Sequence, residues 1–258
     1  MINVTVGGAT GKLGRIVCEL VTASDDMKLV GAIVSPNGGN VGKELYGVIA
    51  SGPADLDRIL EITDVYVDLT SPDAAARVLP AISSKNVNII LGTTAVPKNI
   101  IDTMEENVMR NMTSAVISAN FSKGVNVFWK MCQEMAEYLP DYDMEVVEIH
   151  HHAKKDAPSG TTLETVRRLQ ASSGIDKVVH GREGVVGART REIGVHAIRA
   201  GDVVGDHTVI FAKDMERLDL SHKAISRETL ARGCLDTIRW IAGRKDGLIH
   251  NMGEVFGL

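Results

Sequence analysis

Residues 2–14 have the sequence INVTVGGATGKLG, in which a short apolar run leads directly into a glycine-rich turn. The β-branched run at 2–7 is typical of a buried strand. Apolar residues then recur at helical spacing over residues 12–23. The order of strand, glycine-rich turn and helix predicts the first unit of a parallel α/β fold, with an anion-binding helix N-terminus after the turn.

The three glycines of this turn have separate predicted roles. Gly8 permits the tight turn, Gly11 lets backbone N–H groups approach a pyrophosphate, and Gly14 lets the helix pack closely on the strand. In this strand–turn–helix context the pattern predicts dinucleotide binding. The alternative is a glycine-rich turn that only packs the helix against the strand and binds no ligand.

The end of the second predicted strand bears on which dinucleotide is bound. A site specific for NAD places an acidic residue there, about 20 residues after the glycines, to hold the ribose. This chain has Val34, Ser35 and Pro36 instead, and Lys12 within the turn can attract a 2′-phosphate. We therefore expect NADPH to be accepted at least as well as NADH.

Strands and helices alternate along the first part of the chain, which predicts a Rossmann-like, doubly wound parallel sheet. Beyond Asn120 the pattern changes to a helix, a strand, a helix, three successive strands and a last helix. This change predicts a second, α+β domain whose sheet is an antiparallel meander or an open mixed sheet. The further predicted strands are 29–34, 65–69, 87–91, 115–118, 144–151, 195–199, 203–212 and 217–221, and the further helices are 99–110, 125–139, 159–172, 226–242 and one opened by Ser71 and Pro72.

The composition excludes several classes of protein. The 258 residues are 44% hydrophobic and 24% charged, as in ordinary globular proteins. A net charge of -5 argues against nucleic-acid binding, and no apolar run reaches the ~18 residues of a membrane span. The three cysteines are too far apart for a CxxC zinc or redox pair, and the N-terminus lacks the pattern of a signal peptide. We expect a cytoplasmic protein with no nucleic-acid or membrane partner.

Polar turns follow two of the predicted parallel strands. They are Gly92-Thr93-Thr94 and Ala119-Asn120-Phe121. Because ligands of such sheets bind outside the carboxyl ends of the strands, these turns could border a nicotinamide. Ordinary polar turns at strand ends are the alternative.

Residues 148–161, EIHHHAKKDAPSGT, carry the densest chemistry in the chain. In an extended strand Glu148, His150 and His152 share one face, while His151 points to the other. Three such groups can hold zinc, but the adjacent lysines oppose a divalent cation, so we expect no metal. A solvated basic strand end is a further alternative.

An anion site with a proton donor is the favoured interpretation of this segment. A helix is expected after Pro158, with Thr161 and Glu164 as a capping box, and its first N–H groups can bind a carboxylate. Like-charge repulsion from Lys155 and the histidines should favour the neutral form of Lys154 and make it a better proton donor. Together with a dinucleotide fold, this cluster predicts reduction of a small polycarboxylate.

Further motifs follow at 199–208, RAGDVVGDHT, and 222–227, HKAISR. With the glycine-rich turn, the two strand-end turns and the string HHxxKxDAPSGT at 150–161, the sequence resembles the 4-hydroxy-tetrahydrodipicolinate reductase (dihydrodipicolinate reductase) family over nearly its whole length. The resemblance implies NAD(P)H-dependent reduction of a small cyclic dicarboxylate, 4-hydroxy-tetrahydrodipicolinate, to tetrahydrodipicolinate with loss of water, in diaminopimelate and lysine biosynthesis.

The resemblance also implies roles for individual residues. Hydride would go to C4 of the substrate and a proton would come from His150 and Lys154. His151, Gly160 and Thr161 would hold the substrate carboxylates. The cofactor would lie against Gly8, Ala9, Thr10, Gly11, Lys12, Leu13, Gly92, Thr93, Thr94, Ser118, Ala119, Asn120 and Phe121.

The domain division and the assembly are likewise implied by the resemblance. Residues 1–121 plus 231–258 would form the dinucleotide-binding domain, and residues 122–230 the domain that binds substrate and forms a homotetramer. The chain departs from the family at Ser35, where an acidic residue is usual, and this weakens the expectation of dual cofactor use.

Three other classes are weighed against this one. Short-chain dehydrogenases need a Tyr-xxx-Lys pair, and no tyrosine here has lysine four residues on. Semialdehyde dehydrogenases need a nucleophilic cysteine beside a histidine, and no cysteine lies in a suitable predicted loop. A module that senses nicotinamide without turnover stays open, but it would not need His150 and Lys154.

Overall fold

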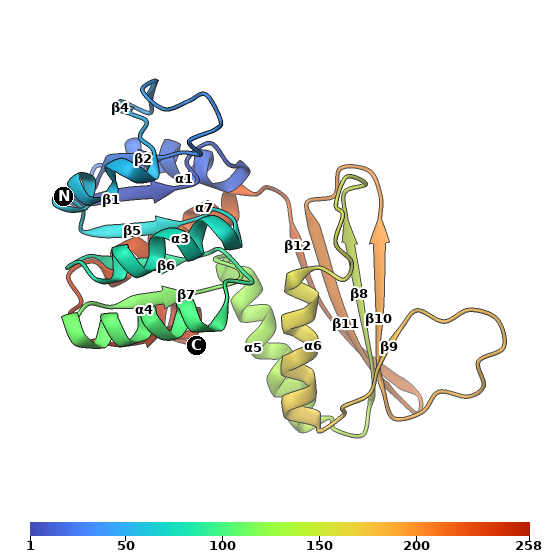
Figure 1. Cartoon of the computed structure of the whole chain (residues 1–258). Helices are drawn as coiled ribbons and strands as arrows, with labels where there is room; N and C mark the ends of the chain where they lie inside the picture. Colours follow the sequence, from blue (N-terminus) through green and yellow to red (C-terminus); the bar gives the residue numbers. More distant parts are fainter. The chain divides into compact units, whose positions relative to one another are not determined.

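The computed structural model describes all 258 residues, which form two compact units. Unit 1 comprises Met1–Ser122 and Glu228–Leu258, and unit 2 comprises Lys123–Arg227. Each unit has its own sheet, as Figure 1 shows. No helix combines the length and the apolar character needed to cross a membrane.

Unit 1 is built on a six-stranded sheet with the order β13-β7-β6-β5-β1-β2, and every strand pairs in parallel with its neighbours. Most residues of the inner strands are apolar and buried, because both faces of the sheet are covered. The predicted doubly wound parallel sheet is therefore confirmed. The strands are β1 (Ile2–Gly7), β2 (Met27–Ile33), β5 (Val65–Asp68), β6 (Asn88–Leu91), β7 (Ala115–Ile117) and β13 (Ile249–His250).

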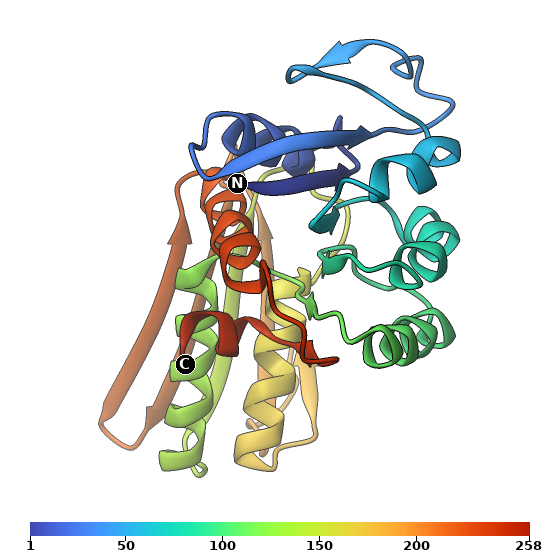
Figure 2. The same cartoon turned by 90° about the vertical axis from the view of Figure 1, so that its left-hand side faces the viewer.

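Helices cover both faces of the unit 1 sheet (Figure 2), and an apolar core on each face holds them to it. One core joins α1 and α7 to the sheet through residues such as Val17 and Ile238. The other joins α2, α3 and α4 through residues such as Leu79 and Met104. As predicted, Ser71 caps α3, with its Oγ accepting the Ala74 N–H at 3.4 Å. The helices are α1 (Lys12–Thr22), α2 (Leu56–Leu60), α3 (Pro72–Ser83), α4 (Lys98–Asn111), α7 (Glu228–Ile241) and α8 (Met252–Phe256), with a 3-10 turn η1 at Pro53–Asp55.

Unit 2 contains a five-stranded mixed sheet with the order β12-β11-β8-β10-β9. Strand β8 runs parallel to β10 and antiparallel to β11, so it separates two strands that are consecutive in the chain. The open mixed sheet is therefore confirmed and the antiparallel meander is wrong. The strands are β8 (Asp143–His150), β9 (Val178–His180), β10 (Ile193–Arg199), β11 (Gly205–Lys213) and β12 (Glu216–Ala224).

Two helices, α5 (Lys123–Tyr138) and α6 (Gly160–Ser173), pack on one face of this sheet. Their shared apolar core includes Trp129, Leu169 and Phe211. On β8 every second residue is buried against that core, and this alternation carries through to Glu148 and His150 at the end of the strand. Polar groups of the predicted active segment are thus placed at the end of an apolar core.

Several short elements are absent from the sequence prediction. They are the hairpin of β3 (Glu44–Leu45) and β4 (Val48–Ile49), strand β9, strand β13 and helices α2 and α8. Each has five residues or fewer, too few to show a clear hydrophobic period.

Candidate active site

The glycine-rich turn between β1 and α1 has no room for side chains at two of its glycines. Gly8 has a positive φ of +78°, and a Cβ there would lie 2.3 Å from the carbonyl oxygen of Leu69. A Cβ at Gly14 would lie 2.2 Å from the carbonyl oxygen of Gly8. The turn therefore depends on glycine at both positions, for its conformation and for the close approach of α1.

The start of α1 fits a bound pyrophosphate. Its N-cap, Gly11, provides no side-chain hydrogen bond, and the first turn contains no acidic residue. The helix begins at Lys12, whose side chain is exposed, and the first N–H groups of an α-helix have no acceptor within the helix. These amides and the lysine suit an anion.

The remaining predicted contacts of the turn differ in what they can offer. Thr10 is exposed and Leu13 is partly buried. Ala9 is fully buried, and its N–H donates to the carbonyl of Ile33 at 3.1 Å. The carbonyl of Ala9 accepts a hydrogen bond from the Tyr46 hydroxyl at 3.3 Å, so Ala9 stabilises the turn through its backbone.

The two strand-end turns lie on the same edge of the sheet as the glycine-rich turn, because β1, β5, β6 and β7 are parallel neighbours. At β6, the Thr93 hydroxyl donates to Asp68 Oδ1 at 2.5 Å and accepts the Thr70 N–H at 2.9 Å. Asp68 is fully buried and also accepts the Thr70 hydroxyl at 2.8 Å. Sequence reasoning missed Asp68, although its position at a strand end was visible.

The turn after β7 is fixed by its own polar side chains. Ser118 Oγ donates to the Asn120 carbonyl at 2.8 Å and accepts the Asn120 N–H at 3.1 Å. Phe121 is buried in the apolar core of unit 1. Of the predicted contacts on this edge, Thr94 and Ala119 have exposed side chains, and Gly92 is tightly enclosed by Leu69 and Phe121.

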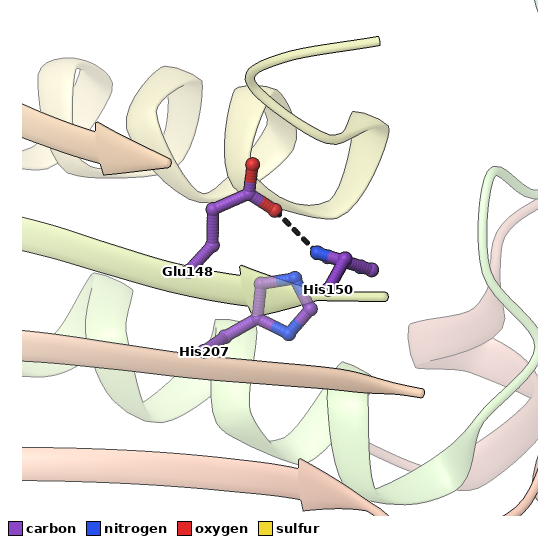
Figure 3. Close-up of side chains that lie close together, drawn as sticks. All are labelled: Glu148, His150 and His207. Carbon is purple, nitrogen blue, oxygen red and sulfur yellow. Dashed lines mark ion pairs between the residues drawn. The ribbon is translucent and has the colours of Figure 1, made fainter. Parts of the chain in front are cut away.

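In unit 2, Glu148, His150 and His207 form a buried cluster, shown in Figure 3. His150 Nδ1 lies 2.6 Å from Glu148 Oε2 on the same strand. His207 comes from β11, where it lies directly opposite Glu148 in the antiparallel register. The two imidazole rings meet edge to face with their centroids 5.2 Å apart.

The prediction that His152 shares one strand face with Glu148 and His150 is wrong. Strand β8 ends at His150, so His152 lies beyond it, exposed, with Nδ1 2.9 Å from the carbonyl oxygen of Gly201. His207 occupies the place that His152 was expected to take. His207 stands within the RAGDVVGDHT motif, but its position beside His150 depends on pairing between β8 and β11, which no local pattern predicts.

Glu148 contacts more groups than any other member of the cluster. Its Oε1 accepts the Ser159 N–H at 3.1 Å and an Arg199 guanidinium N–H at 2.9 Å. Burial raises the pKa of Glu148, but the bonds from His150, Arg199 and Ser159 outweigh burial and lower it to about 2. Burial lowers the pKa of His207 to about 4, with a further lowering by the charge of His150.

The spacing of Glu148, His150 and His207 would also allow a metal ion, because one donor atom from each lies within 4.8 Å of the others. However, each Glu148 oxygen already lies beside a protein nitrogen. Oε2 is 2.6 Å from His150 Nδ1, and Oε1 is 2.9 Å from the guanidinium nitrogen Nη2 of Arg199. A fixed positive charge at that distance opposes a cation. We interpret the cluster as a proton site in which the Glu148 carboxylate lies beside the His150 imidazole.

Lys154 lies in the loop after β8 with 20% of its side chain exposed, and its Nζ is 2.8 Å from Asp156 Oδ2. Asp156 thus gives Lys154 an anionic partner, which the predicted effect of Lys155 and the histidines did not include. Arg199 Nη2 donates to the Asp156 carbonyl at 2.6 Å as well as to Glu148, so one guanidinium ties the lysine loop to the histidine cluster.

Helix α6 begins at Gly160, with Ser159 as its N-cap. Ser159 Oγ accepts the Thr162 N–H at 3.2 Å. The predicted capping box of Thr161 and Glu164 is wrong, because Glu164 forms ion pairs with arginines within the helix. A Cβ at Gly160 would have no neighbour within 4 Å, so the space beside the first turn is open.

The structure thus brings together His150, the loop of Lys154 and the start of α6, all through Glu148 and Arg199. The adjacent His151 is partly buried. A parallel α/β unit whose glycine-rich turn suits a pyrophosphate, and an α+β unit with a buried glutamate–histidine pair beside a helix N-terminus, are typical of a nicotinamide-dinucleotide-dependent reductase.

Comparisons with known proteins give the family. Residues 2–121 match the family model of the dihydrodipicolinate reductase N-terminus, and residues 124–256 match that of its C-terminus. The chain belongs to the dihydrodipicolinate reductase family, as the sequence motifs predict, and is an NAD(P)H-dependent oxidoreductase.

Its relatives are similar over their whole length. It is 44% identical to the 4-hydroxy-tetrahydrodipicolinate reductase of Methanococcus aeolicus, covering 100% of this chain and 99% of that protein. It is 41% identical to the enzyme of the same name from Methanosarcina mazei, covering 100% of both. Among solved structures, the dipicolinate-bound dihydrodipicolinate reductase from Paenisporosarcina sp. TG-14 has a TM-score of 0.79 at 24% identity, covering 97% of each chain, and it shares the fold.

Proposed function

We propose that the protein reduces 4-hydroxy-tetrahydrodipicolinate to tetrahydrodipicolinate with loss of water, as a step of diaminopimelate and lysine biosynthesis. Membership of the family and the names of its full-length relatives support this reaction. The observation that carries it is the buried His150–Glu148 pair, tied to the start of α6 and to the lysine loop. Such a site can bind a carboxylate and donate a proton.

Unit 1 binds the cofactor in this proposal. The turn residues Gly8 to Leu13 hold the pyrophosphate, and the strand-end turns at Gly92 to Thr94 and Ser118 to Phe121 lie towards the nicotinamide. When bound, the reduced nicotinamide supplies a hydride, which C4 of the substrate accepts. The buried Asp68 supports this edge by holding the Thr93 and Thr70 hydroxyls.

Unit 2 binds the dicarboxylate. The amides of Gly160 and Thr161 at the start of α6 hold a substrate carboxylate, because a helix N-terminus attracts an anion, and His151 adds a further contact. His150 and Lys154 donate the proton that the ring takes up at the carbon next to C4. Glu148 and Asp156 hold these two donors at 2.6 Å and 2.8 Å respectively.

NADPH is the preferred cofactor in this proposal. The exposed Ser35 follows Val34 after β2, where an acidic residue would repel a 2′-phosphate, and Lys12 is exposed at the start of α1. Steady-state kinetics with both dinucleotides test this preference. A higher kcat/KM with NADPH is expected, and a strong preference for NADH would contradict it.

We also propose a homotetramer that assembles through the sheet of unit 2. Helices α5 and α6 pack on one face of that sheet, and the other face carries no helix of this unit. Ile149 and Ile198 are paired neighbours on that second face, and Ile198 is 42% exposed. A second copy of the sheet would cover these apolar side chains.

A coupled assay tests the reaction. Aspartate semialdehyde and pyruvate are supplied with the upstream synthase, and loss of NADPH absorbance is followed. Lys154→Ala should lower kcat by ~10²–10⁴, the usual contribution of general acid catalysis, whereas the matched Lys155→Ala should not. Loss of NADPH that does not depend on the synthase would contradict the proposed substrate. A Lys154→Ala effect confined to KM would contradict the proposed role of Lys154 as proton donor.

A further inference from the structure

Glu148 divides its two carboxylate oxygens between two parts of the site. Oε2 lies 2.6 Å from His150 Nδ1, and Oε1 accepts the Ser159 N–H directly before the start of α6. The side chain is fully buried, so water does not compete for either oxygen. One rigid carboxylate therefore links the proposed proton donor to the proposed carboxylate-binding helix.

The other nitrogen of His150 faces a different environment. A Cβ added to Gly205 of β11 would lie 3.0 Å from His150 Nε2. Because glycine stands there, the space beside Nε2 is left open on that side. Nδ1 thus faces the buried carboxylate, and Nε2 is the nitrogen beside which the chain leaves space.

Four charged or titratable groups around His150 are directed at partners other than Nδ1. His207 meets the ring of His150 edge to face, and its own Nε2 lies 3.3 Å from Ser159 Oγ. From β10, Arg199 is directed at Glu148. In the loop, Lys154 is paired with Asp156, and on β12 the partly buried His222 packs against the Phe128 ring.

We propose that Glu148 is the positioning residue of this reductase: it holds the Nδ1 proton of His150 and so presents Nε2 to the substrate as the donating nitrogen. The inference rests on the proposed role of His150 as proton donor. Fixing the tautomer through a buried carboxylate is a common way to orient a catalytic imidazole.

Nitrogen-15 NMR of the wild-type protein tests the tautomer without any substitution. In the neutral imidazole of His150 the one ring proton should be on Nδ1, with Nε2 unprotonated. A neutral His150 protonated on Nε2 would overturn the proposal. Spectra of His150→Gln assign the signal.

Glu148→Gln tests the consequence for activity while keeping the size of the side chain. We expect kcat to fall by ~10²–10⁴, with the KM for the substrate and the affinity for NADPH little changed. Glu148→Asp, which keeps the charge, should restore kcat in part. A wild-type kcat in Glu148→Gln would contradict the proposal, and wild-type fluorescence of the buried Trp129 verifies that unit 2 is folded.

The double variant separates this proposal from the function on which it rests. If Glu148 acts through His150, Glu148→Gln should cause no further loss in a His150→Gln background. Independent, multiplying losses would overturn the positioning role while leaving His150 as the donor. Full activity of His150→Gln alone would instead overturn the proposed proton donor.

Discussion

His207 should make the stability of unit 2 depend on pH in a defined window. Its side chain is buried, and burial, followed by the charge of His150, lowers its pKa from 6.5 to about 4. Between these pH values the unfolded chain binds a proton that the folded chain does not. The free energy of unfolding must therefore fall as the pH is lowered from 6.5 towards 4, and His207 contributes no change above that range.

The size of the effect follows from the two pKa values. Each pH unit corresponds to ~1.4 kcal/mol, so the full loss is about 3 kcal/mol below pH 4 and about 2 kcal/mol at pH 5. Measuring at pH 5 avoids Glu148, whose pKa is lowered from 4.5 to about 2 and whose contribution is lost only below that window.

Urea unfolding at pH 7 and pH 5 measures this loss. The chain has two tryptophans, Trp129 in unit 2 and Trp240 in unit 1, so a Trp240→Phe background leaves Trp129 as a reporter of the unit that contains His207. In that background, His207→Gln should reduce the loss of stability between the two pH values by about 2 kcal/mol. The exposed His180, replaced by Gln, is the matched control. Equal losses with and without His207 would refute the argument.

Three further variants test other parts of the structure. Gly14→Ala places a Cβ 2.2 Å from the Gly8 carbonyl oxygen and should weaken NADPH binding at least tenfold, or ~1.4 kcal/mol, by calorimetry; a wild-type Kd would contradict the close packing of the turn. Lys12→Ala should raise the KM for NADPH roughly tenfold and leave that for NADH nearly unchanged, and equal effects on both would exclude a contact with the 2′-phosphate. Ile198→Asp should reduce the assembled mass in sedimentation velocity, because it places a charge on the helix-free face of the unit 2 sheet; an unchanged mass would exclude this face as the interface.

The parts of the fold that follow from local patterns are predictable from the sequence. The run at residues 2–14 gives β1, the turn and α1 because strand period, glycine conformation and helical spacing all act within a few residues. Ser71 as the cap of α3 is equally local. The two-residue strand β13 depends on its pairing with the distant β7. Strands β3 and β4 pair locally across the turn at Tyr46 and Gly47, but two residues are too few to show a period.

The site shows the same limit at the level of single side chains. Period-two alternation correctly places Glu148 and His150 on one face, but it fails at His152 because the strand ends before that residue. His207 and Arg199 reach the cluster from β11 and β10, about fifty residues further along the chain. Lys154 and Asp156 are only two residues apart, so their ion pair is local in the sequence, and it places an anion beside Lys154 in addition to the neighbouring cations.

The position of Glu148 explains why such distant residues must meet accurately. Its carboxylate faces His150 from its own strand, Arg199 from β10 and Ser159 from the start of α6. A buried carboxylate that loses one of these partners costs several kcal/mol. A one-residue slip of β8 would also turn Glu148 and His150 to the opposite face of the sheet. The proposed proton site therefore helps to specify the register of the strands that build it, so that a sheet paired correctly at β8, β10 and β11 is also one in which His150 is held ready to donate.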